Sequence, residues 1–86
     1  MKRIEWTRKA AKQVLSLPQE VQMAVHRGLT AMLAEWPGAH NVKALTNRED
    51  YRLRIGRYRV LFLVQPTGEV VIFKIVEVKK RDENTY

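Results

Sequence analysis

The sequence lacks cysteine, which excludes disulfide bonds, thiolate metal ligands and cysteine nucleophiles. It also lacks a long hydrophobic segment, because the longest unbroken apolar run is Val60–Val64 and a membrane-spanning helix requires roughly 20 residues. The basic pair Lys2-Arg3 leads into no signal-peptide core. These absences predict a cytoplasmic protein with no redox chemistry and no membrane partner.

Acidic residues are scarce: nine Asp and Glu stand against sixteen Lys and Arg, and the formal net charge is +7. Such an excess of positive charge is typical of a surface that contacts phosphate groups, so we expect a polyanionic partner. No His/Asp/Glu cluster has metal-ligand spacing and no glycine-rich loop has phosphate-binding spacing, so we predict neither a metal nor a cofactor. His26 and His40 lie outside the basic segments and are interpreted as structural or solvent-facing.

Only three prolines and four glycines occur, and several of them mark the ends of predicted elements. Residues 1–6 suit a short strand, and Thr7 suits the N-cap of a helix that ends before Pro18. Proline is also favoured in the first turn of a helix, so a second helix is expected to start at Pro18. Its apolar positions keep helical spacing until Pro37-Gly38 ends the pattern.

Beyond residue 41 the apolar pattern changes to the alternation of strands. Strands are predicted near 42–45, 51–55, 58–64 and 69–78, with tight turns at 56–57 and 66–68. A chain of 86 residues closes one core, so residues 1–86 are expected to form a single domain. The predicted fold class is α+β, with two N-terminal helices packed on one face of a mostly antiparallel four-stranded sheet in the order β-α-α-β-β-β. The other face of the sheet would be uncovered.

Arginine is concentrated in one predicted hairpin: Arg52, Arg54, Arg57 and Arg59 fall between Tyr51 and Val60 with no acid among them. Because side chains alternate along a strand, Arg52 and Arg54 should project from the uncovered face, about 6–7 Å apart. The tight turn should bring Arg59 beside one of them as a cross-strand neighbour. Guanidinium groups so placed repel one another, and a bound phosphate would compensate the repulsion.

The plainer interpretation of this pattern is the solvated face of a strand. A solvated face usually mixes charges of both signs, whereas these four positions are all arginine. The chain also places Lys79, Lys80 and Arg81 at the end of the last predicted strand. Both observations favour a phosphate-binding surface.

The run Tyr51–Val60 resembles the central hairpin of the RelE/ParE toxins, and the closing run Lys79–Tyr86 resembles their basic-then-tyrosine signature. The Leu17-Pro18 junction and the strand order agree, so the resemblance covers essentially the whole chain. It implies the toxin of a type II toxin-antitoxin system, similar to RelE: an endoribonuclease that cleaves mRNA on the ribosome and is neutralised by a cognate antitoxin protein. No cofactor is implied.

The resemblance also implies roles for single residues. Arg52 and Arg54 match the two basic positions of the family's central strand, which are lysines in some members. Arg59 matches the arginine that contacts the scissile phosphate. Lys80 or Arg81 matches the basic residue that protonates the leaving group, and Tyr86 matches a tyrosine that stacks on a base. Arg57 and Lys79 are expected to bind RNA beside them.

Cleavage by the 2′-hydroxyl of RNA requires removal of a proton, stabilisation of a phosphorane and a proton for the departing 5′-oxygen. Arginine suits the second task but stays protonated in proteins, so it is a poor base. Lys80 is flanked by Lys79 and Arg81, whose like charges favour a neutral amine. We therefore expect Lys80 to transfer the proton and Arg54, Arg59 and Arg81 to hold the phosphorane, with the choice between Lys80 and Arg81 left open.

Two other functions remain open on the sequence alone. A ParE-type inhibitor of DNA gyrase would have the same fold without needing the basic set for RNA cleavage. A non-catalytic RNA-binding or ribosome-binding module would use the same charges and leave RNA intact. Tyr86 has a plainer interpretation too, which is to cover an edge of the sheet.

Overall fold

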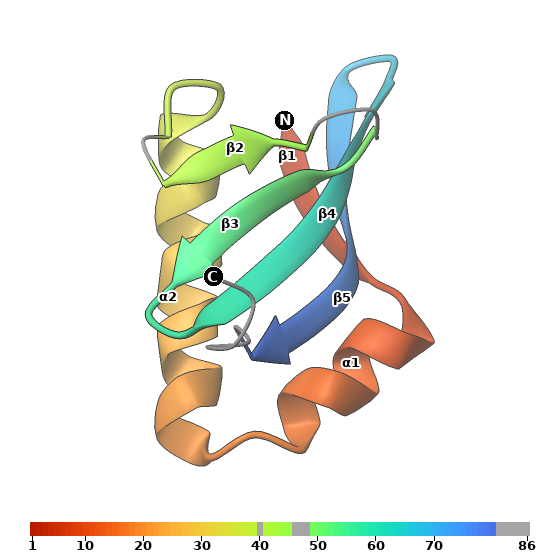
Figure 1. The fold of residues 1–86 in the computed structure, drawn as a ribbon. Coiled ribbons are helices and arrows are strands. Elements are labelled where there is room, and N and C mark those ends of the chain that lie inside the picture. Colours follow the sequence, from red (N-terminus) through yellow and green to blue (C-terminus); the bar gives the residue numbers. More distant parts are fainter. Residues whose placement is uncertain (40, 46–48, 81–86) are drawn as a thin grey trace.

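The computed structural model describes residues 1–39, 41–45 and 49–80, which form two helices and one sheet (Figure 1). In chain order the elements are β1 (Lys2–Trp6), α1 (Arg8–Leu15), α2 (Gln19–Glu35), β2 (Val42–Ala44), β3 (Tyr51–Ile55), β4 (Tyr58–Thr67) and β5 (Val70–Lys80). The two predicted helices and their short joint at Pro18 are confirmed. Neither helix is long and apolar enough to cross a membrane, within the ranges described.

The sheet has five strands in the order β1-β5-β4-β3-β2, so the predicted four-stranded sheet is wrong in number (Figure 1). The meander from β2 to β5 is antiparallel as expected, but β1 pairs with β5 in parallel, which makes the sheet mixed. Alternation of apolar residues identifies a strand without identifying its neighbour. The partner of β1 lies at the other end of the chain, where Val71 N–H donates to Met1 O at 2.8 Å.

The turn between β4 and β5 lies later than predicted, because β4 continues through Pro66 to Thr67 and the turn is made by Gly68 and Glu69. Gly68 has a φ of +59°, a conformation that favours glycine. Pro66 is tolerated in β4 because β3 pairs no further than Phe62, so β4 is an edge strand at Pro66.

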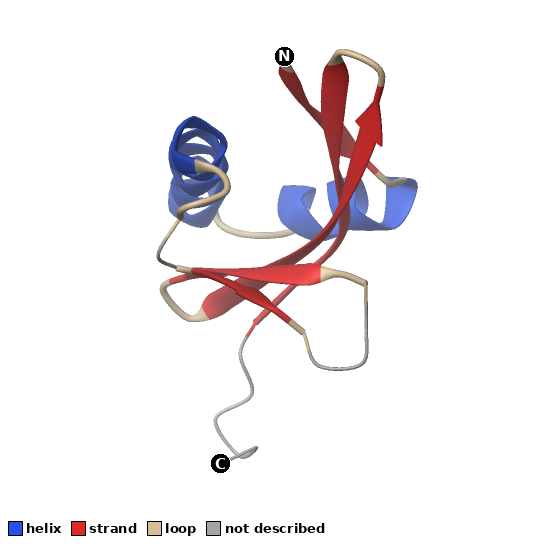
Figure 2. Cartoon of the chain, turned by 90° about the horizontal axis from the view of Figure 1, so that it is seen from above, coloured by secondary structure: helices blue, strands red, loops and turns tan. Residues whose placement is uncertain are grey.

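Both helices pack on the same face of the sheet, as predicted (Figure 2). The core is built from Ala10 of α1, from Val25, Leu29 and Met32 of α2, and from Leu53, Val60, Phe62, Phe73, Ile75 and Val78 of the sheet. Trp36 packs edge-on against Tyr51 and Phe73, with ring centroids 5.2 Å apart in each pair. The opposite face of the sheet is not covered by either helix, and it is called the open face below.

Helix α2 approaches β3 very closely at Gly28. A Cβ atom at this position would lie 2.7 Å from Ile55 Cδ1 and 2.9 Å from Ile55 Cγ1, closer than real Cβ contacts. The absent side chain therefore lets α2 sit directly on Leu53 and Ile55. Because of that contact, the apolar side chains of β3 face the helices. Successive side chains of a strand point to opposite faces, so Arg52 and Arg54 lie on the open face.

Helix α1 lies along β5 beyond the end of β1. Thr7 caps the helix as predicted, because its hydroxyl accepts from Ala10 N–H at 3.1 Å. Further along α1, Gln13 Oε1 accepts from Val78 N–H at 2.7 Å. A strand edge that would otherwise be unpaired is thus held by a side chain. The contact fixes the position of β5 just before Lys79.

Candidate nucleic-acid interface

The open face carries a row of basic side chains across three strands. Leu53 is fully buried against the helices, so its neighbours Arg52 and Arg54 project to the opposite side, as predicted. The strand register sets Arg54 opposite Arg59, and Arg59 opposite Lys79. These three residues, Arg54, Arg59 and Lys79, are called the cationic row. Three neighbouring strands therefore each place one positively charged residue in the same row across the sheet.

The tight turn of the hairpin determines which arginines meet. Gly56 has a φ of +56°, which permits the predicted two-residue turn with Arg57. The register then pairs Ile55 with Tyr58 and Arg54 with Arg59. Arg57 lies in the turn itself, at the end of the hairpin, and does not belong to the cationic row.

Arg54 and Arg59 form the more closely spaced kind of cross-strand pair. Arg54 N–H donates to Asn41 O at 3.1 Å, and Asn41 Nδ2 donates to Arg54 O at 3.2 Å. The backbone N–H and C=O of Arg54 thus point toward Asn41 and away from β4. Arg54–Arg59 is therefore a non-hydrogen-bonded pair, with Cα atoms about 4.5 Å apart. Like charges in this arrangement destabilise a sheet.

Within the described ranges no acid neutralises the arginines of the open face. The ion pairs there are Arg3–Glu5 at 3.1 Å, Lys9–Glu77 at 3.6 Å and Lys79–Glu77 at 4.0 Å. Arg52, Arg54 and Arg59 take part in none of them. Among the residues that the structure describes, the two arginines of the cationic row therefore have no acidic partner.

Glu77 was not identified from the sequence. It lies opposite Leu61 on β4 and contacts lysines on two elements, Lys9 of α1 and Lys79 of β5. Its position two residues before Lys79 in a predicted strand was a usable signal, because such residues share a face. The ion pair with Glu77 places the Lys79 ammonium beside the carboxylate, on the same side of the sheet as Arg59.

Of the two consecutive lysines at the end of β5, Lys79 lies in the cationic row and Lys80 does not. Lys80 pairs with Tyr58, whose own partner Ile55 faces the helices. The register of β4 and β5 shifts by one residue between Leu61 and Phe62. This irregularity determines which residues at the end of β5 face the helices and which lie on the open face. The roles predicted for Arg81 and Tyr86 fall on residues outside the described ranges, as does His40.

A further basic residue, Lys43 on β2, joins the open face. It lies directly opposite Arg52. Together with Asn41, Val42 and Arg54, these two residues line a pocket of about 440 Å³, which is called the β2–β3 pocket. Lys43 was not singled out from the sequence, because a three-residue edge strand has too little alternation to predict its partner or its orientation.

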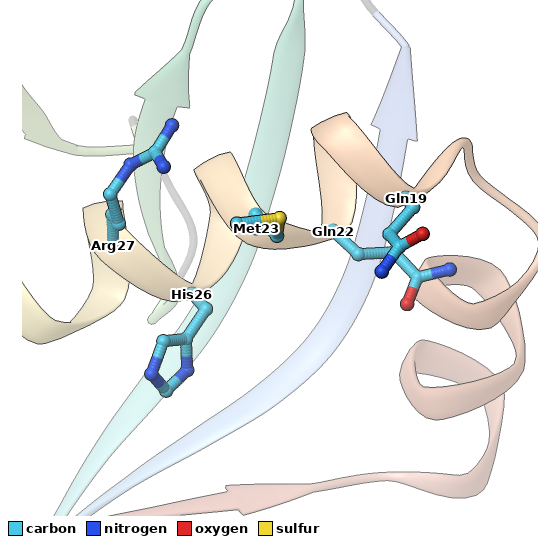
Figure 3. A pocket seen from close by; sticks show the side chains of 5 residues that line it. All are labelled: Gln19, Gln22, Met23, His26 and Arg27. Atoms are coloured by element: carbon cyan, nitrogen blue, oxygen red, sulfur yellow. The ribbon is translucent and has the colours of Figure 1, made fainter.

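His26 lies on the helix layer, away from the cationic row. It lines a depression of about 380 Å³ on the surface of α2 with Gln19, Gln22, Met23 and Arg27 (Figure 3). All five side chains come from successive turns of one helix, and His26 is exposed. The residues that the structure describes contain no group of three His, Cys, Asp or Glu that could hold a metal ion.

No family model matches the chain, and no curated protein matches its sequence. Solved structures do match. A chain of the toxin-antitoxin complex RelBE2 from Mycobacterium tuberculosis is 22% identical with a TM-score of 0.73, over 92% of this chain and 96% of that one. The isolated Escherichia coli RelE toxin is 20% identical with a TM-score of 0.75, over 95% of this chain and 86% of that one. The chain has the RelE-like toxin fold.

The RelE-like fold extends to a third neighbour, a YoeB/ParE toxin from Agrobacterium tumefaciens. That structure is 10% identical with a TM-score of 0.75, over 93% of this chain and 99% of that one. At such identities the likeness concerns the path of the backbone, so the side chains must be judged by their own geometry. In this RelE-like fold, the cationic row and the β2–β3 pocket lie side by side on the open face.

Proposed function

We propose that this protein is the toxin of a toxin-antitoxin system and a metal-independent endoribonuclease that cleaves mRNA on the ribosome. The observation that carries the proposal is the cationic row, in which Arg54 and Arg59 lie opposite each other with no acidic partner in the described ranges. The RelE-like toxin fold supports the toxin role. A polyanion bound to the row relieves the repulsion between the arginines.

The row suits a phosphate that gains negative charge during the reaction. The 2′-hydroxyl gives its proton to water as its oxygen forms a bond to phosphorus, and the bond from phosphorus to the 5′-oxygen breaks. The 5′-oxygen takes a proton from an ammonium group of the protein, which water then reprotonates, so the products are a cyclic phosphate and a 5′-hydroxyl. In between, the phosphorane carries more negative charge than the starting diester. Arg54 and Arg59 donate to its oxygens from neighbouring strands, and removal of one such donor typically costs about 10²–10³ in rate.

Lys79 is the lysine that our proposal places at the departing oxygen. Its ammonium lies on the side of the sheet that carries Arg59, whereas Lys80 lies on the side of Tyr58. An ammonium group can give a proton to the 5′-oxygen as the bond breaks. We therefore propose that Lys79 carries out the proton transfer that the sequence predicts for Lys80. The roles expected for Arg81 and Tyr86 stay predictions.

No arginine of the row can accept the proton of the 2′-hydroxyl at neutral pH. We infer that correct placement of the RNA supplies much of the rate, since a well-oriented intramolecular attack gains several kcal/mol, about 7–11 in favourable cases. The ribosome, which holds mRNA in one defined path, suits this purpose. We therefore propose that cleavage depends on the ribosome.

The test uses purified protein and ribosomes programmed with a defined mRNA, with the 5′ ends of the products mapped. The wild type should cut at codon-phased positions, and Arg59→Ala should cut at least about 100-fold more slowly. Arg27→Ala, on the outer surface of α2, is the matched control and should cut like the wild type. Intact mRNA with the wild-type protein overturns the proposal.

The same experiment needs a DNA gyrase arm, because one structural neighbour is described as a YoeB/ParE toxin. A ParE-type inhibitor would leave mRNA intact and reduce the supercoiling activity of gyrase. A binding module without catalysis would do neither and would lose RNA affinity with salt. The three functions thus give three different results.

The proposed partner is a cognate antitoxin protein. The neighbour from Mycobacterium tuberculosis is described as a toxin-antitoxin complex, which supports this part of the proposal. The net charge of +7 favours an acidic segment in such a partner, through complementary potentials. Co-expression with a candidate acidic antitoxin, followed by purification of a complex, tests it.

A further inference from the structure

We propose that the β2–β3 pocket binds the phosphate next to the scissile one in single-stranded RNA, with Lys43 and Arg52 as its ligands. The inference rests on the proposed function, because it takes the cationic row as the place of cleavage. It adds a second phosphate site with a residue, Lys43, that the sequence did not indicate.

The geometry places the pocket one step from the cationic row. Lys43 and Arg52 lie directly opposite each other on β2 and β3. Arg52 and Arg54 share the open face two positions apart on β3, which corresponds to about 6–7 Å along the strand. An extended RNA backbone can therefore place one phosphate at Arg54–Arg59 and the next at Lys43–Arg52.

The lining of the pocket suits an anion. Lys43, Arg52 and Arg54 supply three positive charges, and no carboxylate lines the pocket. Neither Lys43 nor Arg52 has an ion pair with any residue in the described part of the chain. The amide of Asn41 is engaged with Arg54 O at 3.2 Å, which ties the start of β2 to β3 and keeps the two cations in register.

The pocket suits a phosphate rather than a base. No aromatic side chain lines it, so it offers no platform on which a base can stack. Contacts to phosphates position a nucleic acid without reading its sequence. Lys43 should therefore act on the affinity for RNA and leave the choice of codon unchanged.

The experiment compares wild type and Lys43→Ala on ribosomes programmed with short synthetic mRNAs. One mRNA is unmodified, and in the others a single neutral methylphosphonate replaces the linkage on the 5′ or the 3′ side of the cleavage site. On unmodified mRNA, Lys43→Ala should raise KM about tenfold, the effect of one lost charge-assisted contact, with kcat within twofold. Lys43→Arg should restore the wild-type KM.

The decisive result is the loss of this difference on one modified mRNA. Where the neutral linkage replaces the phosphate that Lys43 binds, wild type and Lys43→Ala should have the same KM. Lys12→Ala, an exposed lysine on α1, is the control and should match the wild type on every mRNA. Lys43 is exposed on an edge strand, so thermal unfolding of Lys43→Ala should match that of the wild type.

Each other outcome overturns the inference in its own way. If the wild type leaves all mRNAs intact, the proposed function fails first. If the wild type cleaves and Lys43→Ala matches it, the pocket binds no phosphate. If the tenfold difference persists on both modified mRNAs, Lys43 contacts the ribosome instead.

Discussion

Arg54 of β3 and Arg59 of β4 lie directly opposite each other across one hairpin, with both side chains on the open face. No acid in the described part of the chain pairs with either of them. A cross-strand pair of like charges opposes folding, so the arrangement is difficult to explain by stability. A bound phosphate, as proposed above, would compensate the repulsion.

Arg59→Gln should stabilise the protein while it slows cleavage at least about 100-fold. Removal of the repulsion from Arg54 should raise the free energy of unfolding by about 0.2–1 kcal/mol at low salt. The gain should shrink at 1 M salt, because exposed charges are then screened. Urea unfolding at both salt concentrations measures it, with Arg27→Gln as the control. A variant that is less stable than the wild type at low salt contradicts the explanation.

Lys79→Ala should slow the cleavage of mRNA on the ribosome far more than Lys80→Ala does. A general acid contributes about 10²–10⁴ to the rate, and only Lys79 lies opposite Arg59. Single-turnover rates measured on the two variants side by side decide the matter, since each is the other's control. The reverse order of effects would return the proton transfer to Lys80 and contradict the role proposed for Lys79.

Gly28→Ala should destabilise the fold, although alanine favours a helix by about 1 kcal/mol over glycine. The new Cβ would lie 2.7 Å from Ile55 Cδ1, and overpacking of this kind costs about 1–3 kcal/mol. Adding Ile55→Val removes that methyl group. The double variant should therefore be less destabilised than the two single variants together, as measured by a double-mutant cycle in urea. Additive effects would mean that the two residues do not clash.

Gln13→Ala should loosen the end of β5. Its side chain accepts from Val78 N–H at 2.7 Å, and a part-buried donor left without a partner costs about 1–3 kcal/mol. Hydrogen exchange at Val78 should accelerate, while exchange at the Leu29 amide in α2 should change only as much as global stability does. Gln19→Ala, on the surface of α2, is the matched control. Unchanged exchange at Val78 would show that the contact carries no stability.

Local patterns in the sequence were sufficient for most of the elements. The spacing of apolar residues identifies both helices, and the residue type of Thr7 at the start of the first pattern predicts the cap that its contact with Ala10 N–H confirms. Strict alternation in β3 placed Leu53 inward and Arg52 and Arg54 outward. These features depend on neighbours within a few residues, and such interactions can be read from one short window.

Pairing between strands that are distant in the sequence could not be predicted from local patterns. The parallel contact of β1 with β5 and the pairing of Lys43 with Arg52 both depend on partners that no local pattern specifies. As a result the place of β1 in the sheet and the β2–β3 pocket were not predicted, although residues 1–6 were predicted to be a strand. The acid Glu77 was missed too, although its distance from Lys79 in the strand was visible.

The sequence by itself determined the helices, the alternation of β3 and the excess of positive charge, because each of these follows from residue type and spacing. Only the tertiary structure decided which lysine of β5 accompanies Arg59. The register of β4 and β5 shifts by one residue between Leu61 and Phe62. A shift of one residue exchanges the two faces of a strand, so it places Lys79 on the open face and Lys80 on the other.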